Sequence, residues 1–130
     1  MLADEYFGRM TTSPFLFIYP YAFESCTELS TVTIPSNVHG IGRYAFYGCS
    51  SLSRVTSFKT LQDIGERAFY GNKELREVKL PSTMNSIGSQ AFSGCVALTE
   101  FIFPEGITEI SHMVLNGASK LKYVSIPDSA

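Results

Sequence analysis

The sequence predicts a mostly β solenoid, in which one short unit of chain is repeated about five times. Two observations lead to this prediction. Equivalent apolar positions recur every 23 residues with no insertion or deletion, and apolar and polar residues alternate after each leucine of the repeat. The clearest columns are the aromatic series Phe23, Phe46, Phe69 and Phe92, which ends at Leu115, and the leucine series Leu29, Leu52, Leu75, Leu98 and Leu121.

Each unit contains one predicted strand, with the pattern L-x-x-V-x-I-P seen at Leu29–Pro35. Proline closes four of these strands, because it has no N–H group to offer a neighbouring strand. The interval of 23 residues lies within the roughly 20–29 residues typical of leucine-rich repeats, where each unit adds one strand to a curved sheet. We therefore expect a right-handed leucine-rich repeat solenoid with a parallel sheet on its concave side.

The rest of each unit returns the chain to the next strand. The pattern V-x-x-I-G, as at Val38–Gly42, predicts a turn that uses glycine's backbone freedom, with Ser111 as the exception. The pattern A-F-x-G-C then places a small residue and an aromatic residue on the core, in a segment too short for a full helix. We expect short turns or 3₁₀ pieces on this convex side, with positive φ at Gly48 and its equivalents.

The periodicity divides the chain into a short first segment and a solenoid. Residues 1–11 are interpreted as a degenerate repeat or the remnant of an N-terminal cap, because Tyr6 keeps the leucine column but Arg9 falls in the valine column. Residues 12–130 form the solenoid, with units near 12–34, 35–57, 58–80, 81–103 and 104–126.

Two units depart from the pattern. In the third unit, Ser57 replaces the last apolar residue of the strand, and Phe58 takes the proline position. A serine there would leave a cavity that costs about 2 kcal/mol or more, so we expect a bulge that turns Phe58 inward, with an exposed Phe58 as the alternative. In the fifth unit, Leu115 and Ala118 replace the usual phenylalanine and cysteine, which predicts a weaker, association-prone end.

Composition and charge restrict the classes of function. The chain has 45% hydrophobic residues, which is enough for a core, and 10 basic against 12 acidic residues give a net charge of -2. This balance predicts no binding of nucleic acid or of an anionic membrane surface. No apolar run approaches the length of a membrane span, and the first residues lack the pattern of a signal peptide.

The repeated units resemble a known family. The segments IPSNVHGIGRYAFYGCSSLSRV and LPSTMNSIGSQAFSGCVALTEF resemble the leucine-rich repeats of BspA-type surface proteins, and the resemblance extends from about Thr12 to Pro127. It implies an extracellular or cell-surface location and adhesion to host or matrix proteins. The asparagine ladder of better-known leucine-rich repeats is missing, so another device must satisfy the corresponding backbone groups.

The cysteines are predicted to be structural. They occupy a single column of the repeat, and their interval matches no zinc-binding pattern. A ladder of buried thiols explains the column, and a disulfide between neighbouring coils is the alternative. The column contains Cys26, Cys49, Asn72, Cys95 and Ala118.

No catalytic or cofactor-binding pattern is present. His39 and His112 fall in different columns, without a nucleophile or acid at catalytic spacing. The chain also lacks a phosphate-binding loop and the zinc-protease motif. We therefore expect no enzymatic activity, no metal and no cofactor.

The polar positions of the strands form two predicted ladders on the concave face. The predicted ion pairs are Arg54 with Glu77 and Lys79 with Glu100, while Ile102 and Tyr123 resemble a small binding hot spot. An ordinary solvated face is the alternative. The ladders are Thr31, Arg54, Glu77, Glu100 and Tyr123, and then Thr33, Thr56, Lys79, Ile102 and Ser125. The predicted ligand-binding residues are Thr31, Arg54, Glu77, Lys79, Glu100, Ile102 and Tyr123.

A second outward group contains Tyr44, Tyr47 and Tyr70, whose rings are predicted to stack or to cover the edge of the core. The favoured function is a non-catalytic protein-interaction or adhesion module that binds a protein or glycan through the concave face. The alternatives are a structural spacer and a fragment that associates with itself through exposed solenoid ends.

Overall fold

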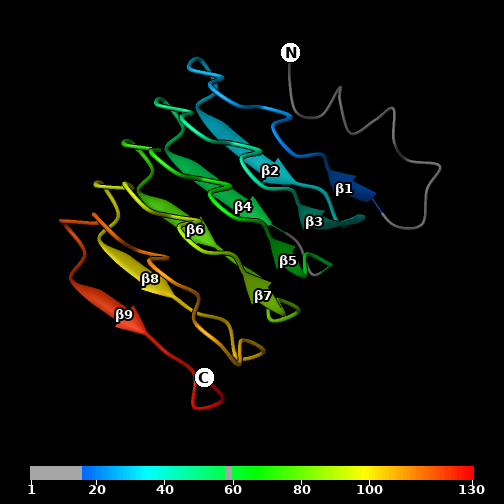
Figure 1. Ribbon diagram of the computed structural model, residues 1–130, viewed down its shortest axis with the longest axis vertical. Coiled ribbons are helices and arrows are strands. Elements are labelled where there is room, and N and C mark those ends of the chain that lie inside the picture. The colour runs from blue at the N-terminus through cyan, green and yellow to red at the C-terminus, as the bar shows by residue number, and fades with distance from the viewer. Residues whose placement is uncertain (1–15, 58–59) are drawn as a thin grey trace.

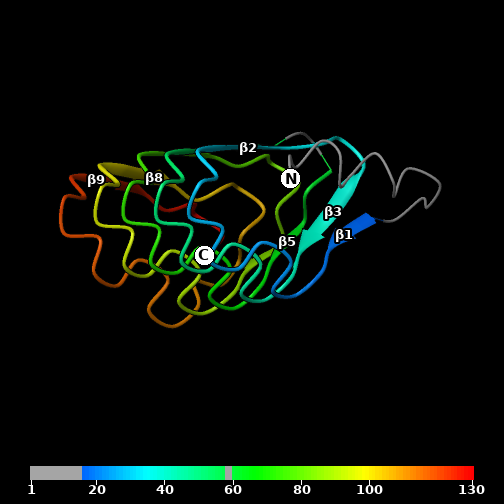
Figure 2. The ribbon, with the colours of Figure 1, turned by 90° about the horizontal axis from the view of Figure 1, so that it is seen from above.

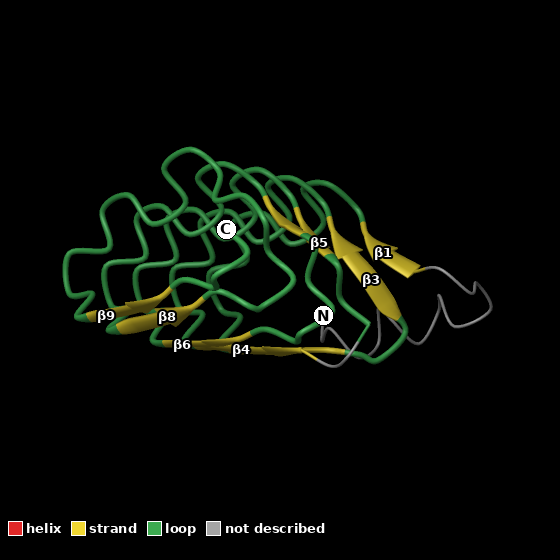
Figure 3. Cartoon of the chain, turned by 90° about the horizontal axis from the view of Figure 1, so that it is seen from below, coloured by secondary structure: helices red, strands yellow, loops and turns green. Residues whose placement is uncertain are grey.

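A computed structural model shows the chain as a parallel β-solenoid of about five coils (Figure 1). The structure describes residues 16–57 and 60–130, and no helix occurs within these ranges. The strands lie in two rows, and each coil passes from one row to the other through turns, as Figures 2 and 3 show from above and below. The predicted mostly β solenoid is confirmed. The predicted first segment 1–11 and Phe58 lie outside the described residues.

The first row of strands is the one that the sequence predicts. It is parallel, and each strand pairs with its neighbour at an offset of 23 residues, as in the pair of Thr31 with Arg54. Pairing is interrupted once, between the third and fourth strands, which divides the row into one sheet of three strands and one of two. The row consists of β2 (Thr31–Ile34), β4 (Arg54–Ser57), β6 (Glu77–Lys79), β8 (Glu100–Ile102) and β9 (Tyr123–Ser125).

The second row forms another parallel sheet, which the sequence patterns do not predict as paired strands. Its order follows the chain, and it ends at the fourth coil. Two of its strands contain only two residues each, which is too short to show an alternation of apolar and polar residues. The strands are β1 (Leu16–Ile18), β3 (Val38–Ile41), β5 (Asp63–Ile64) and β7 (Ser86–Ile87).

The glycines after these strands do not serve the purpose that the sequence suggests. A Cβ atom on Gly65 would lie 2.5 Å from the backbone nitrogen of Arg43, and one on Gly88 would lie 2.6 Å from that of Glu66. Neither glycine has a positive φ. Glycine is therefore needed for close approach between coils and not for turn freedom. In the fifth coil Ser111 takes this position, and the second sheet ends just before that coil.

The turn segments opposite the first row consist of hydrogen-bonded turns, which confirms the first of the two predicted alternatives. Gly48, Gly71, Gly94 and Gly117 have φ between 69° and 79°, as predicted. A second left-handed column contains no glycine and was not predicted from the sequence. Its φ values lie between 52° and 63°, and its members are Tyr21, Tyr44, Arg67, Gln90 and Met113.

The core lies between the two rows of strands. A stack of buried phenylalanine rings runs through four coils, with centroids 5.1 to 5.2 Å apart and planes within 7° of parallel. Removing one such ring would cost about 3–5 kcal/mol, because the transfer free energy is lost and a cavity remains. The stack consists of Phe23, Phe46, Phe69 and Phe92.

The third coil keeps its register at the predicted irregularity. Ser57 remains opposite Ile34 in the pairing of β4 with β2, so no bulge occurs up to that residue. Its hydroxyl donates a hydrogen bond of 3.0 Å to the carbonyl oxygen of Lys79 in the next coil. A polar bond between coils therefore takes the place of the apolar side chain found at this position in other coils.

Candidate binding face

We call the outward side chains of β2, β4, β6, β8 and β9 the ladder face. The strand register aligns them as predicted, with Thr31 beside Arg54 and Arg54 beside Glu77. In the last two strands Glu100 lies beside Tyr123, and Ile102 lies beside the serine two residues farther along. All seven predicted binding residues are exposed. The interruption between β6 and β8 separates them into two groups.

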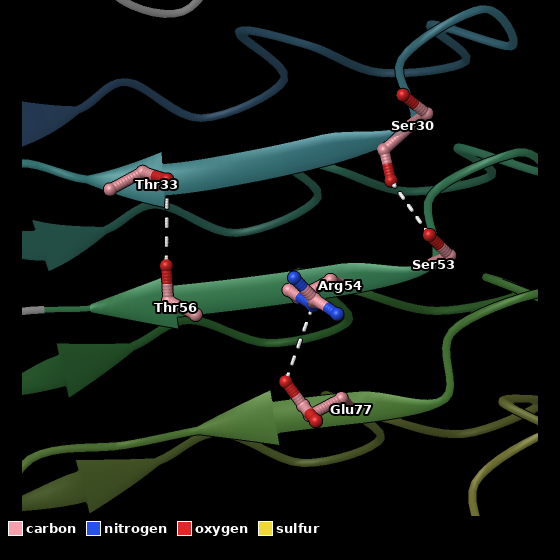
Figure 4. A network of polar contacts seen from close by, with 6 residues as sticks. All are labelled: Ser30, Thr33, Ser53, Arg54, Thr56 and Glu77. Atoms are coloured by element: carbon pink, nitrogen blue, oxygen red, sulfur yellow. Dashed lines mark hydrogen bonds and ion pairs between the residues drawn. The ribbon is translucent and has the colours of Figure 1, made fainter.

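The N-terminal part of the ladder face is a network of polar contacts between coils (Figure 4). The hydroxyl of Ser53 donates a hydrogen bond of 3.1 Å to the carbonyl oxygen of Ser30. Farther along the strands, the hydroxyl of Thr56 lies 3.5 Å from that of Thr33. These short side chains satisfy one another and leave a smooth polar surface.

The predicted ion pair between Arg54 and Glu77 is formed, with 3.3 Å between Nε and Oε1. Their side chains are 60% and 45% exposed, so water and salt screen the pair and it contributes less than about 1 kcal/mol. The predicted pair between Lys79 and Glu100 is not formed in the described part of the chain. These two residues lie on β6 and β8, between which strand pairing is missing.

The C-terminal part of the ladder face has a different character. Ile102 and Tyr123 are each 57% exposed, although both belong to paired strands. They are diagonal neighbours, because Tyr123 lies opposite Glu100. An exposed isoleucine beside an exposed tyrosine offers an apolar surface bordered by a carboxylate.

The cysteine column supplies the device that replaces the missing asparagine ladder. The side chain of Asn72 accepts a hydrogen bond of 2.9 Å from the backbone nitrogen of Cys49, one coil earlier. The thiol of Cys49 in turn donates to the carbonyl oxygen of Phe23 at 3.1 Å and accepts a bond from the main chain of Cys26. Cys95 repeats this arrangement with the carbonyl oxygen of Phe69. Each side chain therefore satisfies backbone groups of the neighbouring coil.

The thiols are inert by virtue of their surroundings. Burial raises the pKa of Cys49 to about 11, against a hydrogen bond from the main chain of Cys26 that lowers it. Burial likewise raises the pKa of Cys95 to about 12. Both groups stay protonated at neutral pH, and a protonated thiol is a poor nucleophile and metal ligand. All three cysteines are free, so the alternative of a disulfide is not formed, and the buried-thiol interpretation fits Cys49 and Cys95.

The predicted tyrosine group does stack. The rings of Tyr47 and Tyr70 lie 5.0 Å apart and nearly parallel, and Tyr21 stacks on Tyr44 at 4.9 Å. Arg67 covers the ring of Tyr44, with its guanidinium carbon 5.7 Å from the ring centroid, and donates a hydrogen bond to the Tyr44 hydroxyl. The sequence could not indicate that Tyr21 and Arg67 belong to this group, because the left-handed column that aligns them has no residue signature.

The described residues contain no group of three or more His, Cys, Asp or Glu side chains placed to hold a metal ion. Nor does any helix within them have the length and apolar character needed to cross a membrane.

A parallel solenoid with 23-residue coils, inward apolar columns and an outward strand ladder defines a leucine-rich repeat protein. The family model for "BspA type Leucine rich repeat region (6 copies)" matches residues 17–130. The chain therefore belongs to the BspA-type leucine-rich repeat family. No curated protein sequence matches it.

Three solved structures are similar to the chain. A leucine-rich repeat protein of T. pallidum has 30% identity and a TM-score of 0.84, over 86% of this chain and 52% of its own. A leucine-rich repeat protein from Bacteroides ovatus has 37% identity and a TM-score of 0.82, over 88% and 30%. A leucine rich cell surface protein from Faecalibacterium prausnitzii has 32% identity and a TM-score of 0.80, over 88% and 32%. The chain thus spans about half or less of the length of these proteins.

Proposed function

We propose that the chain is a non-catalytic adhesion module of a surface or secreted protein, and that it binds a protein ligand through the ladder face. The observation that carries this proposal is the exposure of Ile102 and Tyr123 on adjacent paired strands. Large apolar and aromatic side chains held on a rigid surface are the usual anchors of a protein interface.

The rest of the ladder face suits the surroundings of such an anchor. Glu100 lies beside Tyr123, and Lys79 is exposed on the strand before. Charged groups at the border of an interface influence orientation and the rate of association more than they influence affinity. The polar network at the N-terminal part would contribute less, because its side chains already bind one another.

Family membership supports the remaining parts of the proposal. Leucine-rich repeats generally serve as interaction or surface modules, and one of the similar structures is a cell surface protein. A short solenoid also presents a broad face in place of the deep cleft that most enzymes use.

The test measures binding of the chain to immobilised extracellular-matrix proteins by surface plasmon resonance, with a glycan array in parallel. The double variant Ile102→Lys and Tyr123→Lys should bind matrix protein at least tenfold more weakly, because it replaces both apolar anchors with charges. The control variant Thr31→Lys adds a charge to the polar part of the same face and should keep the wild-type affinity. Thermal melting followed by circular dichroism checks that every variant folds.

Unchanged binding by the folded double variant would refute the ladder face as the binding site. Binding to glycans alone would refute the protein ligand. A chain that binds neither class would favour the structural-spacer alternative.

A further inference from the structure

The inward columns of the fifth coil are open at the C-terminal end of the solenoid. Ile110, Val124 and Ile126 are 39%, 37% and 57% exposed. The residues in the same columns of the fourth coil, Ile87, Phe101 and Phe103, are buried, because the fifth coil covers them. We call the three exposed residues the end face. Their exposure results from the missing neighbour and not from a change in where they point.

A strand edge lies beside the end face. β9 pairs with β8 on one side, and no described strand pairs with it on the other (Figure 1). An unpaired edge next to apolar side chains is a template for a further strand, because its backbone groups and its apolar surface can be satisfied together. The geometry needed is the one by which each coil of this chain already packs on the next.

The opposite end of the solenoid does not offer a matching apolar surface. Ile18, Val32 and Ile34 occupy the same three columns in the first coil and are only 0%, 2% and 0% exposed. Stacking of one chain's last coil on another chain's first coil would therefore bring the end face against columns that are already covered. The apolar surface that fits the end face best is a second end face.

We propose that two copies of this chain form a symmetric dimer through their end faces. A two-fold axis beside β9 pairs this strand antiparallel with β9 of the second copy and brings Val124 and Ile126 of each copy together. Such a contact is closed, because the same surface is used by both partners, so association stops at two. The ladder faces of both copies then lie on the same side of one continuous sheet.

The experiment measures mass by sedimentation equilibrium over a hundredfold range of concentration. The wild-type chain should approach twice the chain mass as concentration rises. The variant Ile126→Lys should remain monomeric, because two buried lysines would face each other across the axis. Ile102→Lys is a matched control, since Ile102 has the same 57% exposure but points from the ladder face, and it should dimerise like the wild type.

A wild-type chain that stays monomeric at every concentration overturns the proposal. A series of species beyond the dimer also overturns it, because growth of that kind requires head-to-tail contacts. Equal dimerisation of Ile126→Lys and the wild type would place the contact elsewhere. The two variants also separate this proposal from the adhesion function: Ile102→Lys weakens ligand binding without affecting mass, and Ile126→Lys has the opposite effect.

Discussion

The first and fifth coils contain the same columns but treat them differently. In the first coil the inward isoleucines and valine are buried, and in the fifth coil the equivalent residues are partly exposed. The fifth coil has also lost the glycine that permits close approach, since Ser111 stands at that position. A column thus decides which side chain points inward, while the neighbouring coil decides whether it is buried. Four predictions test this distinction, from the largest expected effect to the smallest.

The largest effect should come from the phenylalanine stack. Phe69→Ala removes a ring with neighbours at 5.1 and 5.2 Å and should lower the free energy of unfolding by about 3–5 kcal/mol. Leu115→Ala changes the same column in the fifth coil, where the side chain is only half-buried, and should cost about 1 kcal/mol. Urea unfolding measures both. Equal losses would show that the fifth coil is packed as tightly as the third.

A methyl group added to a close-approach glycine should have the next largest effect. Gly65→Ala places a Cβ atom 2.5 Å from the backbone nitrogen of Arg43, which forces the coils apart at a cost of about 1–3 kcal/mol. The control Ser111→Ala, in the fifth coil, already has a Cβ atom and should be nearly neutral. The midpoint of thermal unfolding distinguishes them, and a neutral Gly65→Ala would contradict the close-approach role.

The cysteine column allows a smaller test. Asn72→Ala removes the acceptor that binds the backbone nitrogen of Cys49 and should destabilise the chain by about 1–2 kcal/mol. Asn72→Cys should preserve stability, because a thiol satisfies the equivalent groups at Cys95. Chemical denaturation checks the pair. If alanine were tolerated as well as cysteine, the column would be explained by residue size alone, as the native Ala118 of the fifth coil would then suggest.

The smallest effect concerns backbone strain in the first coil. Ser25 has φ of 56° in the column that is glycine in later coils. Ser25→Gly should stabilise the chain by about 0.5 kcal/mol, because glycine adopts this conformation without a steric penalty that partly exceeds its entropy cost. Gly71→Ser, the reverse change in the third coil, should destabilise by a similar amount. Stabilisation by both substitutions would contradict a role for φ.

The sequence predicted the features that depend on position within a unit. The interval of 23 residues was enough to place the strands, their register and the outward ladder, because a repeat without insertions puts equivalent residues side by side. Features that depend on contact between coils were less accessible. The close approach at Gly65 has the same sequence pattern as a turn glycine, and the second sheet contains strands of two residues.

The candidate site shows the same limit. Alignment of Arg54 with Glu77 follows from the register, and their ion pair is present. The pair of Lys79 with Glu100 has the same spacing but requires β6 and β8 to pair, and they do not. The left-handed column was also hidden, because tyrosine, arginine, glutamine and methionine have no preference for positive φ that would mark it.

The bonds between coils have a mechanical consequence. They join residues 22 to 26 positions apart, as in the bonds from Tyr21 to Arg43 and from Cys49 to Phe23. A force applied to the two chain termini would therefore load one coil boundary at a time and detach whole coils in succession. The fifth coil, whose second-row strand is missing, should detach first. Each detached coil of 23 residues would lengthen the chain by about 80 Å, giving a regular series of steps in a pulling experiment.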